Sequence, residues 1–127
     1  MENAQLVTVA IVDDHAMLRQ AINLRLSLLG YKIVLEAENG QEFLDQLVKL
    51  PAPPDICLLD INMPVLDGFD TALMLKKNWP HIKILFFSMH NSKAYMMRAR
   101  QIGANGFLSK DASLEELKQT FDKVLNG

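Results

Sequence analysis

The stretch Ile56-Cys57-Leu58-Leu59-Asp60-Ile61-Asn62-Met63-Pro64 decides how the rest of the sequence is interpreted. Four consecutive apolar residues before a turn are typical of a strand buried on both faces, as in the middle of a parallel sheet. This strand ends abruptly at Asp60, whose ionised carboxylate is costly to bury unless a partner compensates its charge. Ligands of open α/β sheets bind outside the carboxyl ends of the strands, where we expect Asp60. Taken alone, however, the stretch fits a surface aspartate in a strand-to-loop turn equally well.

Length and composition describe one ordinary globular domain over residues 1–127, with half of its residues hydrophobic and 22% charged. The net charge of −2 argues against direct nucleic-acid binding by this domain, since phosphate contacts need a basic patch. Its one cysteine, Cys57, cannot form an internal disulfide. We find no apolar stretch of about 18 residues and no signal peptide, so we predict a cytoplasmic protein without a membrane segment.

Hydrophobic periodicity and turn signals predict five strands that alternate with five helices. Such alternation predicts an α/β fold, a doubly wound parallel sheet with helices on both faces and right-handed crossovers. Ser113 and Glu116 predict a capping box that opens the last helix, and we expect Leu114 to be among its inward residues. The predicted strands cover 6–12, 31–37, 56–59, 82–87 and 107–108, and the predicted helices cover 16–29, 39–50, 69–79, 91–102 and 113–125.

Polar residues follow four of the predicted strands: Asp13 and Asp14, Asp60, Ser88 and Lys110. Because all carboxyl ends of a parallel sheet lie on one edge, we expect these five residues to converge. Clustered carboxylates repel one another unless a cation lies between them, and Mg²⁺ is usually held by one or two carboxylates, water and a phosphate. The cluster therefore predicts a phosphoryl-transfer site. Asp60 is the candidate nucleophile, and Lys110 and Ser88 are the candidate ligands of the phosphoryl oxygens.

Each of these residues also has an ordinary structural explanation. Asp13 and Asp14 are favoured types at the start of a helix, where they would only cap the next element. A serine at a strand end is most often a turn residue, and a single lysine is generally solvated. The joint placement of all five residues at one edge favours the functional interpretation.

The sequence resembles the receiver domain of bacterial two-component response regulators over nearly its whole length. This resemblance implies a CheY-like, flavodoxin-like fold with five helices and the strand order 2-1-3-4-5. It also implies that the domain is a signalling switch and not an enzyme with an external substrate. The matching residues are Asp13-Asp14, Asp60, Met63-Pro64, Asp67-Gly68, Ser88, Gly103-Ala104 and Lys110.

The resemblance also implies a chemistry for the site. Mg²⁺ would be held by Asp14, Asp60 and the backbone carbonyl of Asn62, with Asp13 nearby, directly or through water. Asp60 would accept a phosphoryl group from a histidine kinase or a phosphotransfer protein. The domain would later hydrolyse its own aspartyl phosphate.

Other positions match the family's switch residues. The resemblance implies that Ser88 turns toward the new phosphoryl group, and that Phe107 moves from an outward to an inward position on activation. His90 occupies a position that influences access of water, and is a candidate modulator of phosphoryl lifetime. For Met96 and Met97, on the expected output face, we predict that one packs in the core. The other is then available as an adaptable partner contact.

The stretch Gly106-Phe107-Leu108-Ser109-Lys110-Asp111-Ala112-Ser113 resembles the NarL/FixJ (LuxR-type) subfamily. Asp111 replaces the proline that often follows the lysine, and a cis bond before it would cost about 2.5–4 kcal/mol, so we expect none. The resemblance implies transcriptional control through a C-terminal helix-turn-helix domain that is absent from this chain, with homodimerisation on activation as one option. The sequence is also compatible with a stand-alone receiver acting by protein–protein interaction.

Two further alternatives come from other classes of protein. A metal-dependent aspartyl-phosphate phosphatase that resembles the haloacid dehalogenases would carry Asp-x-Asp, whereas here Asn62 follows Asp60 at that spacing. A pseudo-receiver would have an incomplete acidic pocket, and this one is complete. We therefore predict a phosphorylation-driven switch.

Overall fold

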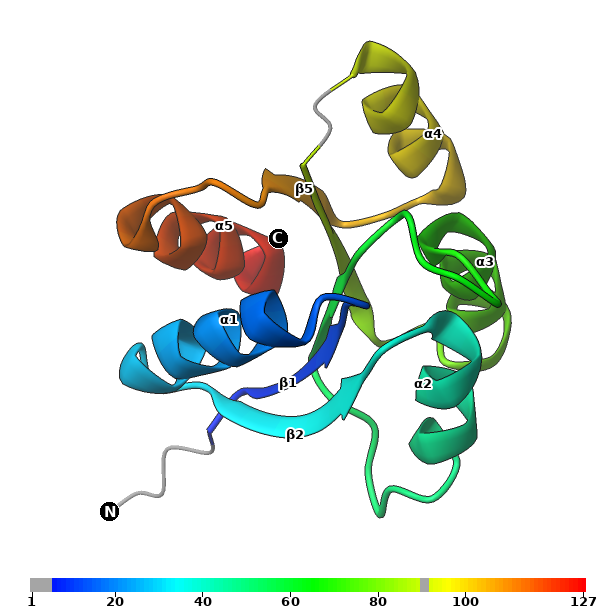
Figure 1. Ribbon diagram of the computed structural model, residues 1–127, viewed down its shortest axis with the longest axis horizontal. Helices are drawn as coiled ribbons and strands as arrows, with labels where there is room; N and C mark the ends of the chain where they lie inside the picture. Colours follow the sequence, from blue (N-terminus) through cyan, green and yellow to red (C-terminus); the bar gives the residue numbers. More distant parts are fainter. Residues whose placement is uncertain (1–5, 90–91) are drawn as a thin grey trace.

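The computed structural model describes residues 6–89 and 92–127, in which strands and helices alternate (Figure 1). No helix within these ranges is long and apolar enough to cross a membrane. The strands are β1 (Thr8–Val12), β2 (Lys32–Ala37), β3 (Ile56–Leu59), β4 (Lys83–Ser88) and β5 (Gly106–Ser109). The helices are α1 (Ala16–Leu28), α2 (Gly40–Leu47), α3 (Gly68–Asn78), α4 (Lys93–Ile102) and α5 (Leu114–Asn126).

The five strands form one parallel sheet in the order β2-β1-β3-β4-β5, which confirms the predicted fold and strand order. The strand β3 lies in the centre and its four apolar residues are buried, as expected for a strand with helices on both sides. Its last residue, Leu59, pairs with Val12 of β1 and with Phe86 of β4. This register brings the carboxyl ends of the three strands to the same edge of the sheet.

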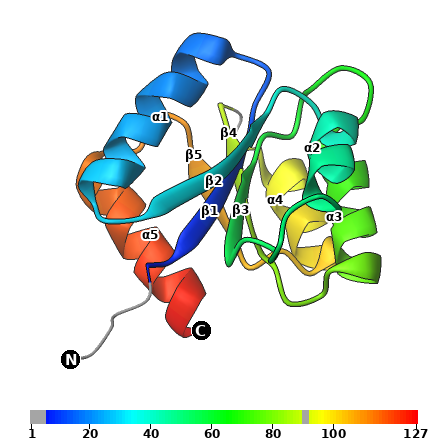
Figure 2. The same cartoon turned by 90° about the horizontal axis from the view of Figure 1, so that it is seen from below.

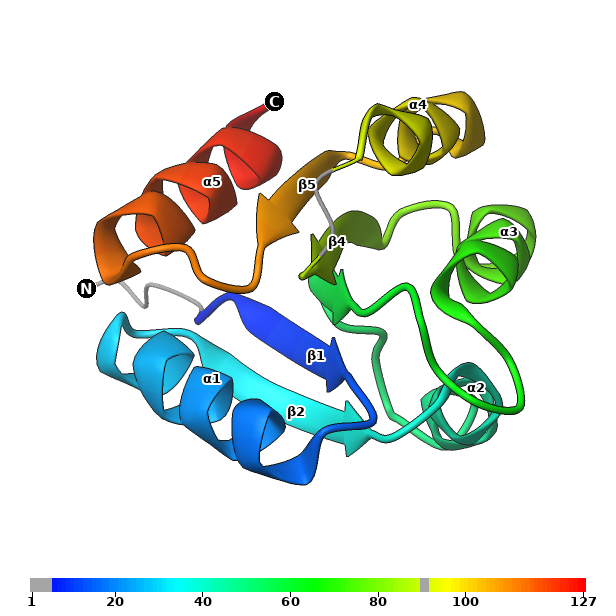
Figure 3. The same cartoon turned by 45° about the horizontal axis from the view of Figure 1, so that its top comes forward.

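Helices cover both faces of the sheet, α1 and α5 on one side and α2, α3 and α4 on the other (Figures 2 and 3). Each side has its own buried apolar cluster. Successive residues of β3 alternate between them: Ile56 and Leu58 belong to the α1–α5 side, and Cys57 and Leu59 to the α2–α4 side. The sheet therefore separates two cores.

Side-chain caps begin four of the helices. Asn39, Asp67, Ser92 and Ser113 each accept a hydrogen bond from the backbone N–H three residues later. The predicted capping box of Ser113 and Glu116 is present. The start of α1 differs, because its N-cap residue, His15, makes no side-chain capping bond.

Two predictions about burial are wrong. Leu114 is 43% exposed, because the first residue of α5 faces solvent while Leu117 and Phe121 face the core. Met96 and Met97 are both exposed, at 42% and 59%. The inward stripe of α4 is formed by Tyr95, Ala99 and Ile102, at helical spacing, and of these only Ala99 is fully buried. Both methionines lie beside this stripe, not in it.

Candidate functional site

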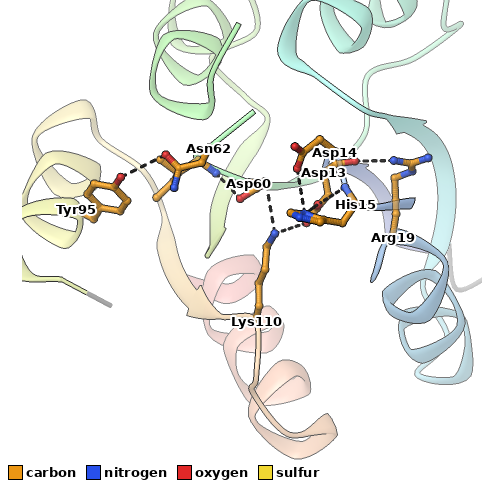
Figure 4. Close-up of polar contacts among 9 residues, drawn as sticks. Asp13, Asp14, His15, Arg19, Asp60, Asn62, Tyr95 and Lys110 are labelled. Carbon is orange, nitrogen blue, oxygen red and sulfur yellow. Dashed lines mark hydrogen bonds and ion pairs between the residues drawn. The ribbon is translucent and has the colours of Figure 1, made fainter. Parts of the chain in front are cut away.

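The loops at the carboxyl edge of the sheet bring four of the predicted polar residues together, Asp13, Asp14, Asp60 and Lys110 (Figure 4). Asp13, Asp60 and Lys110 are only 1%, 4% and 8% exposed, and Ser88 is also buried. Full burial of charged side chains is rare unless they are paired. Asp60, Ser88 and Lys110 line a cavity of about 90 Å³. Its other lining residues are His15, Asn62 and Met89.

Lys110 compensates the buried carboxylates. Its Nζ lies 2.7 Å from Asp13 Oδ2 and 3.3 Å from Asp60 Oδ2. Its backbone N–H donates to the carbonyl of Ser88 (2.9 Å), so pairing of β5 with β4 determines where the lysine leaves the sheet. None of the described peptide bonds is cis, which agrees with the trans bond expected between Lys110 and Asp111.

The acidic residues form a cluster in which ligand atoms of Asp13, Asp14, His15 and Asp60 all lie within 4.8 Å of one another. Three carboxylates at this spacing are a donor set that fits a hard cation such as Mg²⁺, and the partly exposed Asp14 leaves one side open to water. His15 is the N-cap residue of α1. However, its Nδ1 also lies 3.2 Å from Asp13 Oδ1 and 3.1 Å from Asp14 Oδ1, a contact that the sequence did not reveal.

The structure contradicts the alternative in which the acidic pair simply caps α1. The N-cap residue is His15, and the first turn of the helix contains no acidic residue. Asp13 Oδ1 accepts a hydrogen bond from the backbone N–H of His15 (2.9 Å), and the side chain is buried toward Lys110. Asp13 therefore belongs to the acidic cluster and pairs with Lys110.

Asp60 has an unusual electrostatic environment. The pKa of its carboxyl is raised to about 6, mainly by burial and also by the neighbouring Asp13 carboxylate, whereas Lys110 opposes the shift. The backbone N–H of Ile61 donates to Asp60 Oδ1 (2.8 Å) and fixes the plane of the carboxylate. A buried acid with a perturbed pKa, a fixed orientation and a cavity in front of it is a good candidate for a reactive group.

Two features that support the site, the contacts of Arg19 and the close approach of Gly68, were not predicted from the sequence. Arg19 donates from Nη1 to the carbonyl of Asp13 (2.6 Å) and from Nε to Glu36 on β2 (3.2 Å), so it anchors the acidic loop (Figure 4). Gly68 starts α3 directly against Asp60 and Ile61, which follow β3. A Cβ there would overlap the carbonyl oxygen of Asp60 and lie 2.7 Å from Ile61 Cα. The turn signal Asp67-Gly68 marked this glycine, but the close approach depends on tertiary packing.

The two predicted switch residues lie on neighbouring strands. Ser88 is the last residue of β4, and Phe107 is half-buried on β5, where it packs against the core of the α2–α4 side. Phe107 also lines a cavity of about 300 Å³ together with Met96 and Ala99. His90 lies outside the described residues.

A doubly wound, CheY-like sheet with an acidic cluster and a buried lysine at its carboxyl edge defines the class of fold. A family model of the response regulator receiver domain matches residues 9–122. The chain therefore belongs to this family, as the sequence predicted. Receiver domains of two-component response regulators are signalling switches that bind Mg²⁺ at an acidic pocket and interact with histidine kinases or phosphotransfer proteins.

Individual relatives agree with this assignment. The chain is 39% identical over 119 residues to a Pseudomonas aeruginosa protein provisionally named a transcriptional regulator, covering 94% of this chain and 56% of that protein. It is 32% identical to the nitrate/nitrite response regulator NarL of Escherichia coli, covering 100% and 58%. A Staphylococcus aureus DNA-binding response regulator of the LuxR family has 28% identity and a TM-score of 0.87, covering 95% and 100%. The chain spans little more than half the length of these two curated relatives.

Proposed function

We propose that this receiver domain accepts a phosphoryl group on Asp60 from a histidine kinase or a phosphotransfer protein. The observation that carries this proposal is the buried Asp60, with a pKa near 6, which lies 3.3 Å from Lys110 Nζ and lines a cavity of about 90 Å³ together with it. A cavity this small accommodates a phosphoryl group but no large substrate. At pH 7 and above, most Asp60 carboxylates are ionised and hence nucleophilic.

The proposed transfer is an in-line displacement. An Asp60 oxygen attacks the phosphorus of a phosphohistidine, the P–N bond breaks, and the donor's ring nitrogen keeps the electron pair. Lys110 and Ser88 would bind the phosphoryl oxygens. The Ile61 N–H keeps the carboxylate in its orientation during attack. Hydrolysis then reverses the modification, since water attacks phosphorus, the P–O bond to Asp60 breaks and inorganic phosphate leaves.

The donor set for Mg²⁺ would consist of Asp14, Asp60 and the backbone carbonyl of Asn62, with Asp13 nearby. Bound Mg²⁺ supplies positive charge that balances the phosphoryl oxygens. Asp13 has a second task in this proposal, because it keeps Lys110 in the pocket through their 2.7 Å ion pair. Arg19 in turn holds the loop that carries both acids.

Phosphorylation would act as a change of local charge. The new group adds roughly −1.5 to −2 charges at Asp60 and attracts Ser88 and Lys110. Ser88 ends β4 and Lys110 directly follows β5, next to α4 and α5. The shift would therefore bias a pre-existing equilibrium on that side of the molecule, with Phe107 following. We propose that transcription is the output, through a DNA-binding domain in a longer polypeptide, with or without homodimerisation. Location in the cytoplasm remains a prediction.

The decisive experiment is intact-mass analysis after incubation with acetyl phosphate and Mg²⁺. We expect the wild-type domain to gain one phosphoryl group, the Asp60→Asn variant to gain none, and Asp55→Asn, at the other end of β3, to behave as wild type. Absence of a mass gain in the wild type, or an equal gain in Asp60→Asn, would contradict the proposal.

A further inference from the structure

A tyrosine on α4 reaches the loop that follows Asp60. The hydroxyl of Tyr95 donates to Oδ1 of Asn62 at 3.3 Å, across 33 positions of sequence (Figure 4). Asn62 lines the cavity together with Asp60. This contact therefore joins the pocket to a helix that contributes no residue to the cavity lining.

The ring of Tyr95 is seated by contacts that do not involve its hydroxyl. It meets the ring of Phe69 edge-on, with centroids 5.7 Å apart and an interplanar angle of 90°. Phe69 is buried on α3, packs against Phe86 of β4, and carries the guanidinium of Arg98 at 4.4 Å on its ring. Removal of the hydroxyl alone should leave α4 in place and remove the hydrogen bond to Asn62.

We propose that Tyr95 is a positioning residue for the phosphoryl-transfer site, an inference that rests on the proposed function. Its hydroxyl restrains the side chain of Asn62, and this restraint limits rotation of the residue whose backbone carbonyl is a proposed Mg²⁺ donor. Partners of metal ligands commonly change metal affinity 10–100-fold. Tyr95 acts through a side chain and at a distance longer than the usual 2.7–2.8 Å, so a smaller change, about 3–10-fold, is expected.

The same contact makes the coupling reciprocal. If Tyr95 strengthens Mg²⁺ binding at the pocket, then Mg²⁺ must strengthen the attachment of Tyr95, and with it the first turn of α4, by the same factor. The helix is suited to respond, because only Ala99 among its ten residues is fully buried. Amide hydrogen exchange in the first turns of α4 should therefore slow when Mg²⁺ is added.

The test compares two chemically identical changes in the two tyrosines of the chain. Tyr95→Phe removes the hydroxyl near the pocket. Tyr31→Phe removes one on the other side of the sheet, where the ring packs against Phe121. By isothermal titration calorimetry with Mg²⁺ alone, Tyr95→Phe should raise Kd about 3–10-fold, whereas Tyr31→Phe should leave Kd unchanged. Mg²⁺ should slow α4 exchange in the wild type and in Tyr31→Phe, but not in Tyr95→Phe.

A double-mutant cycle with Asn62→Ala tests the route of the effect. Asn62→Ala removes the acceptor but keeps the backbone carbonyl, so it should weaken Mg²⁺ binding to a similar extent, and adding Tyr95→Phe should then have no further effect. The Asn62→Ala variant also tests the inference if Tyr95→Phe fails to fold. The inference would be overturned if either Tyr95→Phe or Asn62→Ala folds and binds Mg²⁺ with the same Kd as the wild type. It would also be overturned if Tyr95→Phe raised the Kd as much in the Asn62→Ala background as in the wild type.

These outcomes are distinct from failure of the proposed function. A wild-type domain that neither binds Mg²⁺ nor gains mass with acetyl phosphate overturns the proposed function and this inference together. A wild-type domain that does both, beside a Tyr95→Phe variant that matches Tyr31→Phe, overturns only the role of Tyr95.

Discussion

Two aspartates flank the central strand β3, and their surroundings differ sharply. Asp55, before the strand, is exposed, and its carboxylate accepts hydrogen bonds from the backbone N–H (2.8 Å) and hydroxyl (3.2 Å) of Thr8. Asp60, after the strand, is buried beside Asp13 and has a pKa near 6. The same residue type thus stabilises the fold at one edge of the sheet, as Asp55, and lowers its stability at the other edge, as Asp60. This cost is common at reactive sites, where function competes with stability.

The largest expected effect comes from disrupting the close packing of α3 against Asp60, which has no counterpart at Asp55 in the part of the chain that the structure describes. Gly68→Ala should lower the free energy of unfolding by about 3 kcal/mol or more, because its Cβ must displace the backbone of Asp60. Urea unfolding measures this change. Gly30→Ala is the matched control: it has open space around it and only the strain of its positive φ, which costs about 1 kcal/mol. Similar losses for the two variants would show that α3 does not start tightly against Asp60.

The second prediction concerns the sign of the two aspartates' contributions. Asp60→Asn should stabilise the domain without Mg²⁺ by up to about 2 kcal/mol at pH 8, since a pKa raised from about 3.9 makes the charged form unfavourable in the folded state. Asp55→Asn should instead destabilise it by about 1 kcal/mol through weakened hydrogen bonds to Thr8.

The pH dependence follows from the raised pKa of Asp60. Between about pH 4 and 6 the folded state holds more protons than the unfolded state, so this carboxyl lowers stability as pH rises, and its full penalty is present above pH 6. The gain from Asp60→Asn should therefore shrink below pH 5 in urea titrations. A gain independent of pH, or a loss at pH 8, would contradict the electrostatic account.

The smallest expected effect concerns backbone strain between Asp60 and α3. Val65 has φ of 69°, the one non-glycine residue with positive φ in the described ranges. It sits in a tight turn in which the N–H of Leu66 donates to the carbonyl of Pro64 (2.8 Å). Val65→Asn should raise the free energy of unfolding by about 0.5–1 kcal/mol, measured by thermal melting, since asparagine tolerates positive φ better than a β-branched residue.

Val48→Asn provides the control for Val65→Asn. Val48 is likewise an exposed valine, but it has a helical φ at the end of α2, so the same replacement should not increase stability there. An equal gain at both positions would indicate a general effect of surface polarity and not relief of strain.

The sequence pattern was sufficient for the parallel sheet and for the convergence of the site residues, whereas the strand order followed from the resemblance to receiver domains. Short apolar runs that end in polar residues specify both a buried strand and the edge where its polar residue emerges, and this pattern placed Asp13, Asp60, Ser88 and Lys110 together. Contacts between distant segments had no such local signal. The Arg19–Glu36 and Tyr95–Asn62 hydrogen bonds depend on how helices lie against the sheet.

Helix rotation explains the errors in burial. Apolar composition indicated a core role for Leu114 and for one of Met96 and Met97, but a few tens of degrees of rotation decide which apolar residues face inward. In α4 the large ring of Tyr95 occupies the inward stripe and leaves both methionines exposed.

The separation of the two cores by the sheet has an evolutionary consequence. Substitutions under α1 and α5 change packing with Ile56 and Leu58, whereas those under α2, α3 and α4 meet Cys57 and Leu59. Surfaces on the two sides can therefore diverge toward different binding partners with little mutual interference. The polar edge of the sheet, where Asp60 follows β3, borders both cores. Substitutions in one core must therefore remain compatible with the other at this edge.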